Sequence, residues 1–252
     1  DVCRAQQVSH VVMAGGIPKT SSIEGIKTYG GKVICFAPSA RIGQKLIKMG
    51  ADALIIEGME AGGHIGPVAT SVLAQEILPE ITDVPVFVAG GIGRGEAIVS
   101  YLRMGASGVQ LGTRFVCAQE SIAHPNFKQS FIKAAARDAM PSVQLDPEFP
   151  VIPVRALANK ATHDFMRFQA NIIEKYRQGQ IEKKEAQLEI EHFWAGALRR
   201  AVMDGDMENG SIMAGQSVGM VTKIQPMREI VDELIQQAQY FIAGATSQTH
   251  AA

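Results

Sequence analysis

The sequence predicts an α/β fold in which parallel strands alternate with helices, as an open sheet or as a closed barrel. Short apolar runs rich in valine and isoleucine alternate with amphipathic stretches between residues 8 and 115. The runs are apolar almost without interruption, as strands are when both faces of a parallel sheet are covered or when the sheet closes on itself. The strand–loop–helix unit recurs about every 20 to 30 residues, which is the length of a βα unit.

Five apolar runs are the predicted strands, and three amphipathic stretches between them are predicted helices. Each helical stretch ends near glycine or proline, which are the usual stop signals. The strands are SHVVMAGG (9–16), KVICFAP (32–38), ADALIIEG (51–58), VPVFVAGG (84–91) and GVQLGTRF (108–115), and the helices are 40–50, 71–81 and 95–105.

After Phe115 the pattern becomes mostly helical. Helices are predicted over 123–139, 161–178, 182–206 and 227–244, whereas 140–157 carries four prolines and predicts a loop or short extended pieces. The small-residue segment 210–221 is expected to return to the sheet. The chain is therefore divided into a barrel portion (1–118), a mostly helical insert or substrate domain (119–209), and a return segment with a C-terminal helix packing on the barrel (210–252).

The composition is that of an ordinary globular protein and excludes several classes of function. Of 252 residues, 46% are hydrophobic and 19% charged, and the net charge of −1 gives no support for nucleic-acid binding. The apolar runs fall short of the ~20 residues of a membrane span, and no signal-peptide pattern opens the chain. The three cysteines form no CxxC pair, and Cys35 and Cys117 lie within or after apolar runs, so we expect these two as buried thiols and a cytoplasmic setting. No His/Cys cluster has metal-ligand spacing, so no metal is expected.

Glycines at the ends of the last two predicted strands indicate a phosphate site. In α/β folds ligands bind at the carboxyl ends of the strands. Gly90 and Gly91 would let a ligand approach the backbone, and the helix beginning near Gly95 would offer N–H groups. Gly112 and Thr113 would add further donors. The alternative is that these glycines serve only tight turns.

The stretch EGMEAGGHIGP follows the third predicted strand and is the main candidate for catalysis. Gly62 and Gly63 directly precede His64, so the backbone can bend sharply there. An imidazole with an ordinary pKa of ~6.5 can give or take a proton near neutrality. We predict a functional role for His64 and a ligand contact for Glu57, which closes the strand, and we assign Glu60 to the surface. The alternative is a hydrogen-bonded bystander histidine.

Other candidates carry weaker signals. Gln216, in the stretch MAGQSVGM, is either a ligand contact or part of a closely packed small-residue segment. His124 is expected to start a helix, while His163, His192 and His250 are expected on helical or terminal surfaces.

Four motifs in order, EAGGHIG, VAGGIGRGEA, GASGVQLGTRF and GSIMAGQSVGMV, resemble the nitronate monooxygenase (2-nitropropane dioxygenase) family. That family is closely related to the FMN-dependent enoyl-acyl-carrier-protein reductases. The resemblance covers nearly the whole chain from about Val8. It implies a TIM-type (β/α) barrel holding FMN, with a smaller helical domain after the last strand. Since five strands are found, we expect the barrel to be N-terminally incomplete, with about five of eight βα units.

The resemblance also implies roles for individual residues. Glu57 stands where the family often carries glutamine, and His64 would face the substrate near the flavin. The residues implied to contact FMN are Glu57, Gly62, Gly63, Gly90, Gly91, Gln110, Leu111, Gly112, Thr113 and Gln216.

Two reactions follow from the resemblance. In the first, a nitronate is oxidised with O2 to a carbonyl compound and nitrite, and His64 orients the anion or deprotonates a nitroalkane. In the second, NAD(P)H reduces FMN and an enoyl thioester accepts hydride. An inosine monophosphate dehydrogenase-like barrel would need a cysteine in a strand-end loop, and none is placed so. An inactive barrel fragment acting as a partner, and a homodimer, also remain open.

Overall fold

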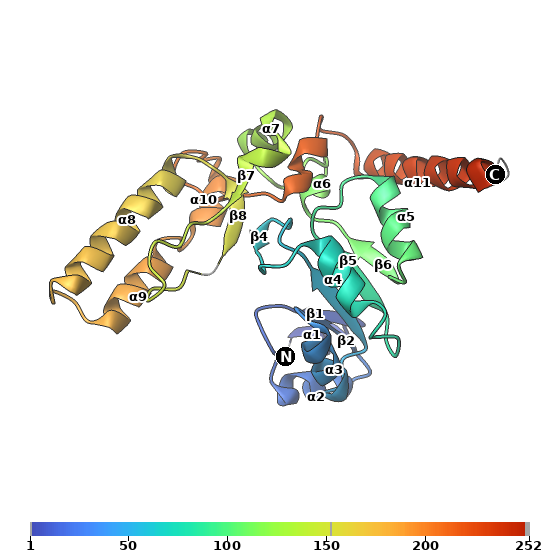
Figure 1. The fold of residues 1–252 in the computed structure, drawn as a ribbon, viewed down its shortest axis with the longest axis horizontal. Helices are drawn as coiled ribbons and strands as arrows, with labels where there is room; N and C mark the ends of the chain where they lie inside the picture. The colour runs from blue at the N-terminus through green and yellow to red at the C-terminus, as the bar shows by residue number, and fades with distance from the viewer. Residues whose placement is uncertain (1, 152, 250–252) are drawn as a thin grey trace. The chain divides into compact units, whose positions relative to one another are not determined.

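The computed structural model describes residues 2–151 and 153–249, which form two compact units (Figure 1). The first unit contains Asp1–Met59, Gly66–Leu111 and Leu234–Ala252. The second unit contains Glu60–Ile65 and Gly112–Glu233. The division into the three segments expected from the sequence stays a prediction.

The first unit is built on a parallel sheet whose five strands confirm the five predicted ones. The order is β1-β2-β3-β5-β6, and every neighbouring pair is parallel. Among the described residues, β1 and β6 form the two edges of this sheet. The strands are β1 (His10–Met13), β2 (Lys32–Phe36), β3 (Ala53–Glu57), β5 (Val86–Ala89) and β6 (Gly108–Gln110). The last run was predicted too long, since residues 113–116 turn into a helix.

The helices of the first unit follow the strands as the βα pattern predicts. They are α1 (Val2–Ala5), α2 (Thr20–Lys27), α3 (Ala40–Lys48), α4 (Thr70–Ile77) and α5 (Gly95–Arg103). The side chain of Ser39 caps α3 by accepting from the N–H of Ile42. Helix α2 was missed because it is short, contains a glycine and buries only Ile23 and Ile26.

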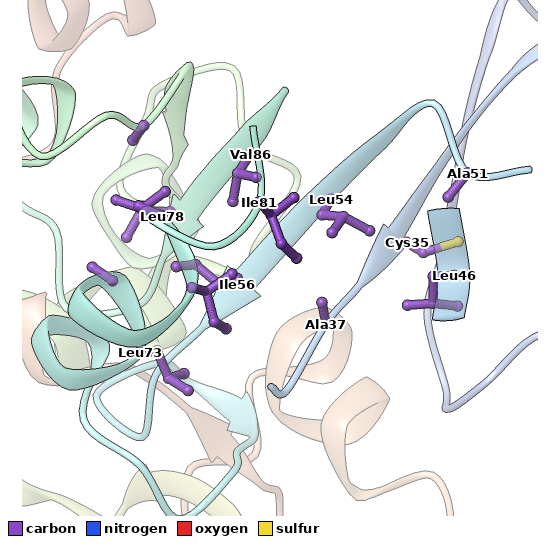
Figure 2. Packing of buried hydrophobic residues seen from close by; sticks show 14 of the residues in the cluster. Cys35, Ala37, Leu46, Ala51, Leu54, Ile56, Leu73, Leu78, Ile81 and Val86 are labelled. Atoms are coloured by element: carbon purple, nitrogen blue, oxygen red, sulfur yellow. The ribbon is translucent and has the colours of Figure 1, made fainter. Parts of the chain in front are cut away.

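One face of the parallel sheet packs against α2, α3, α4 and α5 to form the largest core of this unit. Alternating residues such as Leu54 and Ile56 of β3 are fully buried there. Figure 2 shows their side chains among Leu46, Leu73 and Ile81. Burial also raises the pKa of the Cys35 thiol, so this cysteine packs as a small apolar residue.

The other face of the parallel sheet is apolar but only partly covered. Val12 is 50% exposed, and Ile34, Phe36 and Phe87 are half-buried. The pairing register places Phe36, Ile55 and Phe87 in one row across three strands. The continuous apolar runs predicted two covered faces, whereas the helices of this unit cluster on one of them.

Helix α11 (Met227–Thr249) begins in the second unit, and from Leu234 onward it belongs to the first. There it lies against α5. The Gly95 N–H donates to Gln237 Oε1 at 2.9 Å, and the Arg103 guanidinium lies 5.6 Å from the Phe241 ring centroid. A Cβ placed on Gly95 would collide with the carbonyl of Leu234. Glycine at this position therefore allows the two helices to touch.

The second unit contains a small antiparallel sheet and the remaining helices. Its strands are β4 (Gly63–His64), β7 (Ala139–Pro141), β8 (Val154–Leu157) and β9 (Ile212–Met213), with β8 paired to the other three. The segment 210–221, expected to return to the parallel sheet, pairs with β8 instead. The helices are α6 (Thr113–Val116), α7 (Pro125–Lys133), η1 (Ala136–Asp138), α8 (Lys160–Arg177), α9 (Lys183–His192), α10 (Ala197–Asp204) and η2 (Gln216–Met220).

Two of the helices predicted for this unit are shorter in the structure than the sequence indicated. The stretch 182–206 is broken between α9 and α10, where Gly196 adopts φ +70°. Likewise the helix predicted to reach residue 139 ends at Lys133. The long helix α8 begins with a capping box in which Asn159 and Thr162 bond to each other's backbone N–H.

One face of the antiparallel sheet contributes to a core of its own. Ala139, Leu157 and Ile212 point to the same face and pack with Phe127 and Phe131 of α7. A further core fills the space between α8 and α9, which Figure 1 shows running side by side. In the described part of the chain, no helix has the length and apolar character needed to cross a membrane.

We expect Gly95→Ala to lower the free energy of unfolding by ~1–3 kcal/mol, because the added methyl group would push α11 away from α5. Gly25→Ala is the matched control, since Gly25 lies inside α2 with no heavy atom within 4 Å of a Cβ. That change should stabilise by ~0.5–1 kcal/mol through helix propensity. Urea unfolding of both variants measures the two changes in the free energy of unfolding. Equal changes would contradict the close contact between Gly95 and α11.

Candidate functional site

The carboxyl ends of the parallel strands bring together several residues predicted from the sequence. Glu57 of β3 pairs with Ala89 of β5, and Ala89 pairs with Gln110 of β6. The Gly58 N–H donates to the Ala89 carbonyl at 3.2 Å, which extends the pairing past the strand end. Gly90 and Leu111 directly follow this row, so these ends form one continuous edge of the first unit.

Gly90 and Gly91 are explained by the backbone itself. Their φ angles of +95° and +74° lie in the left-handed region that favours glycine. A Cβ on Gly90 would also lie 3.0 Å from both the Gly58 carbonyl oxygen and Thr70 Oγ1. The buried Thr70 hydroxyl donates to the Gly90 carbonyl at 3.1 Å. The geometry of the tight turn therefore explains by itself why both residues are glycine, whether or not a ligand lies beside them.

The start of α5 differs from the expectation of free donors. The Gly95 N–H is bound by Gln237. Arg94 forms an ion pair with Glu96 at 2.6 Å, so its charge is already partly neutralised.

Glu57 is half-buried at the end of β3. Within the described residues, its carboxyl group makes no hydrogen bond or ion pair. Burial, with no charged neighbour contributing, raises its pKa. A carboxyl group in this state can bind a ligand as a neutral donor or as an acceptor.

Gly112 behaves differently from the other glycines. Its φ of −111° and ψ of −68° suit any residue, and a Cβ there would have no heavy atom within 4 Å. Neither backbone nor packing therefore requires glycine at this position, and the space beside it is open. The next residue, Thr113, accepts a hydrogen bond from the Gly215 N–H at 2.9 Å, which leaves its hydroxyl proton available.

The loop of residues 60–65 is held by backbone contacts with the segment 214–216. A Cβ on Gly62 would lie 2.5 Å from the Gly215 nitrogen and 2.6 Å from the Ala214 carbonyl carbon. The Gln216 N–H donates to the Glu60 carbonyl at 2.9 Å. Gly62 is thus required by packing, and Gln216 contributes its backbone to the loop.

The same loop carries His64 onto the antiparallel sheet. His64 pairs with Val154 and Gly63 pairs with Arg155, and the Ile65 N–H donates to the Pro153 carbonyl at 3.0 Å. Arg155 is buried and donates to the Ala139 carbonyl. Burial lowers the pKa of Arg155, and the charge of Glu60 opposes that shift. Glu60, assigned to the surface from the sequence, is half-buried and helps to hold this loop.

His64, which is solvent-exposed, lines an apolar cavity of about 340 Å³ in the second unit. Paired residues of neighbouring strands share a face, so the register places His64, Val154, Ala156, Met140 and Met213 together on it. Helices α8 and α9 and the residues after α9 form the opposite wall. The lining residues are His64, Met140, Ser142, Val151, Val154, Ala156, Thr162, Phe165, Ile190, Glu191, Trp194, Ala195, Ser211 and Met213.

Few polar groups face this cavity. The described lining residues include no lysine or arginine. The His64 ring makes no hydrogen bond to the described residues, and neither does the Ser211 hydroxyl, although Ser211 is only 4% exposed. Ser211 and Trp194 are not among the site residues predicted from the sequence. The sequence did carry one signal for Ser211: it stands two residues before Met213, which is the spacing of residues on one face of a strand.

Cys117 and the acidic side chains are further groups that could take part in chemistry. Burial raises the pKa of Cys117 to about 11, so its thiolate is scarce at neutral pH. No group of three or more His, Cys, Asp or Glu side chains among the described residues could hold a metal ion.

Comparisons with known proteins agree with the resemblance seen in the motifs. The family model described as nitronate monooxygenase matches residues 1–237. A dehydrogenase of Rhodococcus jostii, which acts on a hydroxy-methyl-oxo-octahydroindene carboxyl-CoA, is 28% identical over 88% of this chain and 68% of its own length. A probable nitronate monooxygenase of Bacillus subtilis is 26% identical over 88% of this chain and 61% of its own length.

Among solved structures, FabK from Thermotoga maritima is 32% identical, with a TM-score of 0.84 over 98% of this chain and 73% of that protein. The chain therefore spans about two thirds of the length of these relatives. With the family match spanning most of its residues, the chain belongs to the nitronate monooxygenase family.

Proposed function

We propose that this chain is an FMN-dependent oxidoreductase and that nitronate oxidation is the first candidate for its reaction. The observation that carries the proposal is the position of His64 in the lining of an apolar cavity, where its ring makes no hydrogen bond to the described residues. Membership of the family and the likeness to a probable nitronate monooxygenase support it.

We further propose that the parallel sheet is part of a TIM-type (β/α) barrel. Helices α2 to α5 all contribute to one cluster on one face of the sheet. In a barrel that face is the outside, and the partly covered apolar face is the inside. This arrangement explains why the strands are apolar on both faces although the unit's own helices cover only one.

The residues present fit the phosphate group of FMN. Backbone amides of Gly90, Gly91 and the segment Gln110–Thr113 follow the last two strands, where βα barrels hold phosphates. Gly112 has an open space that a Cβ would fill, as expected where a ligand lies against the backbone. The Thr113 hydroxyl proton is available to a phosphate oxygen. When bound, FMN supplies the redox chemistry that no side chain offers.

His64 would then handle the substrate. Its imidazole can hydrogen-bond a nitronate oxygen when protonated, or remove a proton from a neutral nitroalkane when unprotonated. His64 is solvent-exposed, so the bound substrate itself would shield the ring from water, and this would strengthen either interaction. The overall reaction consumes O2 and yields a carbonyl compound and nitrite.

Reduction of an enoyl thioester by NAD(P)H is the second candidate, and the cavity lining favours it. A nitronate is a small anion, whereas the described lining is mainly apolar and includes no lysine or arginine. A neutral acyl chain suits such walls better. Nitrite release from propionate 3-nitronate, compared with NAD(P)H consumption in the presence of crotonyl thioester, separates the two reactions. A folded, colourless protein that cannot be reconstituted with FMN would contradict both and favour a role as a partner.

We expect His64→Ala to spare FMN binding while lowering turnover by ~10²–10⁴-fold, because a positioned acid–base group is lost. The measurement is turnover with either substrate beside an FMN titration. His163→Ala is the control, since His163 is exposed on α8 and does not line the cavity. If FMN binding fails in His64→Ala alone, the histidine is structural.

Gly112→Val should have the opposite effect, weakening FMN binding by at least about tenfold, since a clash costs over ~1.4 kcal/mol. The backbone angles and the open space predict an unchanged fold. Flavin fluorescence quenching measures the affinity, and thermal unfolding without FMN checks the fold. Unchanged affinity would refute the placement of the phosphate.

A further inference from the structure

We propose that Glu57 couples cofactor binding to pH: its carboxyl group takes up a proton when FMN binds, so affinity falls as pH rises. This inference rests on the proposed function. The inference concerns only residues of the first unit. It goes beyond the proposed function because it states that FMN binding is accompanied by the uptake of a proton.

The position of Glu57 motivates the proposal. It closes β3, and its register partner Ala89 directly precedes Gly90, whose amide we place at the phosphate. Neighbouring strands lie ~4.8 Å apart, so the carboxyl group and a phosphate at Gly90 would be within about 10 Å of each other. The side chain is half-buried, so water screens the two charges incompletely.

No described group compensates the charge of Glu57. The neighbouring strand ends present no group that titrates: they carry Phe36 of β2 with Ala37 and Pro38 after it, Ala89 on β5 and Gln110 on β6. The Thr70 hydroxyl from α4 donates to the carbonyl of Gly90. Glu60, the nearest acid in the sequence, belongs to the second unit and interacts with Arg155. Burial alone already raises the pKa of Glu57 above its ordinary value.

A bound dianion would raise that pKa further, because like charges disfavour the ionised form. The sign follows from linkage. Below the pKa of free Glu57, both states are protonated and affinity does not change with pH. Between the free and the bound pKa, binding requires proton uptake, and affinity falls by up to about tenfold for each pH unit. FMN's own phosphate ionises near pH ~6 and acts in the opposite direction.

The experiment compares FMN dissociation constants of the wild type and Glu57→Gln, by fluorescence quenching, from about pH 5 to pH 8. The ionisation of free FMN is the same in both titrations, so it cancels in their ratio. We expect the ratio of wild type to variant to rise with pH by about tenfold or more across this range. Calorimetry in two buffers of different ionisation enthalpy should show proton uptake that is larger for the wild type.

Two controls make the result specific. Glu76→Gln removes an exposed carboxyl group on α4 and should keep the wild-type profile. Riboflavin has the same ring without the phosphate, so its ratio should depend less on pH. A ratio that is flat or falls with pH, in proteins that bind FMN, overturns the role of Glu57 and leaves the proposed function standing. If neither protein binds FMN, the proposed function fails and the inference fails with it.

Discussion

The close backbone contact between Gly62 and Gly215 is the constraint on which the candidate catalytic residue depends. It lets the loop of residues 60–65 lie directly on the segment 214–216, where the Gln216 N–H reaches the Glu60 carbonyl. The loop can then pair with β8, and the register of that pairing turns His64 toward the apolar cavity. Any side chain at residue 62 would separate the two backbones and shift the histidine.

Glycine is present in the four motifs for different physical reasons, although the sequence alone does not distinguish these positions. Gly62 is required by packing, and Gly90 and Gly91 are required by their positive φ angles. Gly112 meets neither requirement, and open space lies beside it. A glycine that the fold does not need is better evidence for a bound ligand than one that the backbone demands. Gly112 therefore supports the phosphate site more strongly than the more conspicuous pair Gly90–Gly91.

Glu57 at the end of β3 and Glu60 in the loop that follows differ in how their charges are compensated. Glu60 lies near a buried guanidinium, and its charge is partly compensated by Arg155. Glu57 has no such partner among the described residues and carries the cost of burial itself. Proteins seldom bury a carboxyl group without compensation. Ligands of α/β folds bind at the carboxyl edge of a parallel sheet, so this uncompensated carboxyl group is the basis of our proposal for Glu57.

The sequence alone determined the local architecture and the candidate residues. Continuous apolar runs with glycine at their ends identified all five parallel strands, because that pattern depends on burial within a few residues. The motifs also identified His64 and the strand ends. Only the tertiary structure decided that α9 and α10 are separate, that 212–213 pairs with β8, and that Ser211 and Trp194 line the cavity with His64. These features depend on contacts between residues far apart in the chain, and local periodicity carries no information about such contacts.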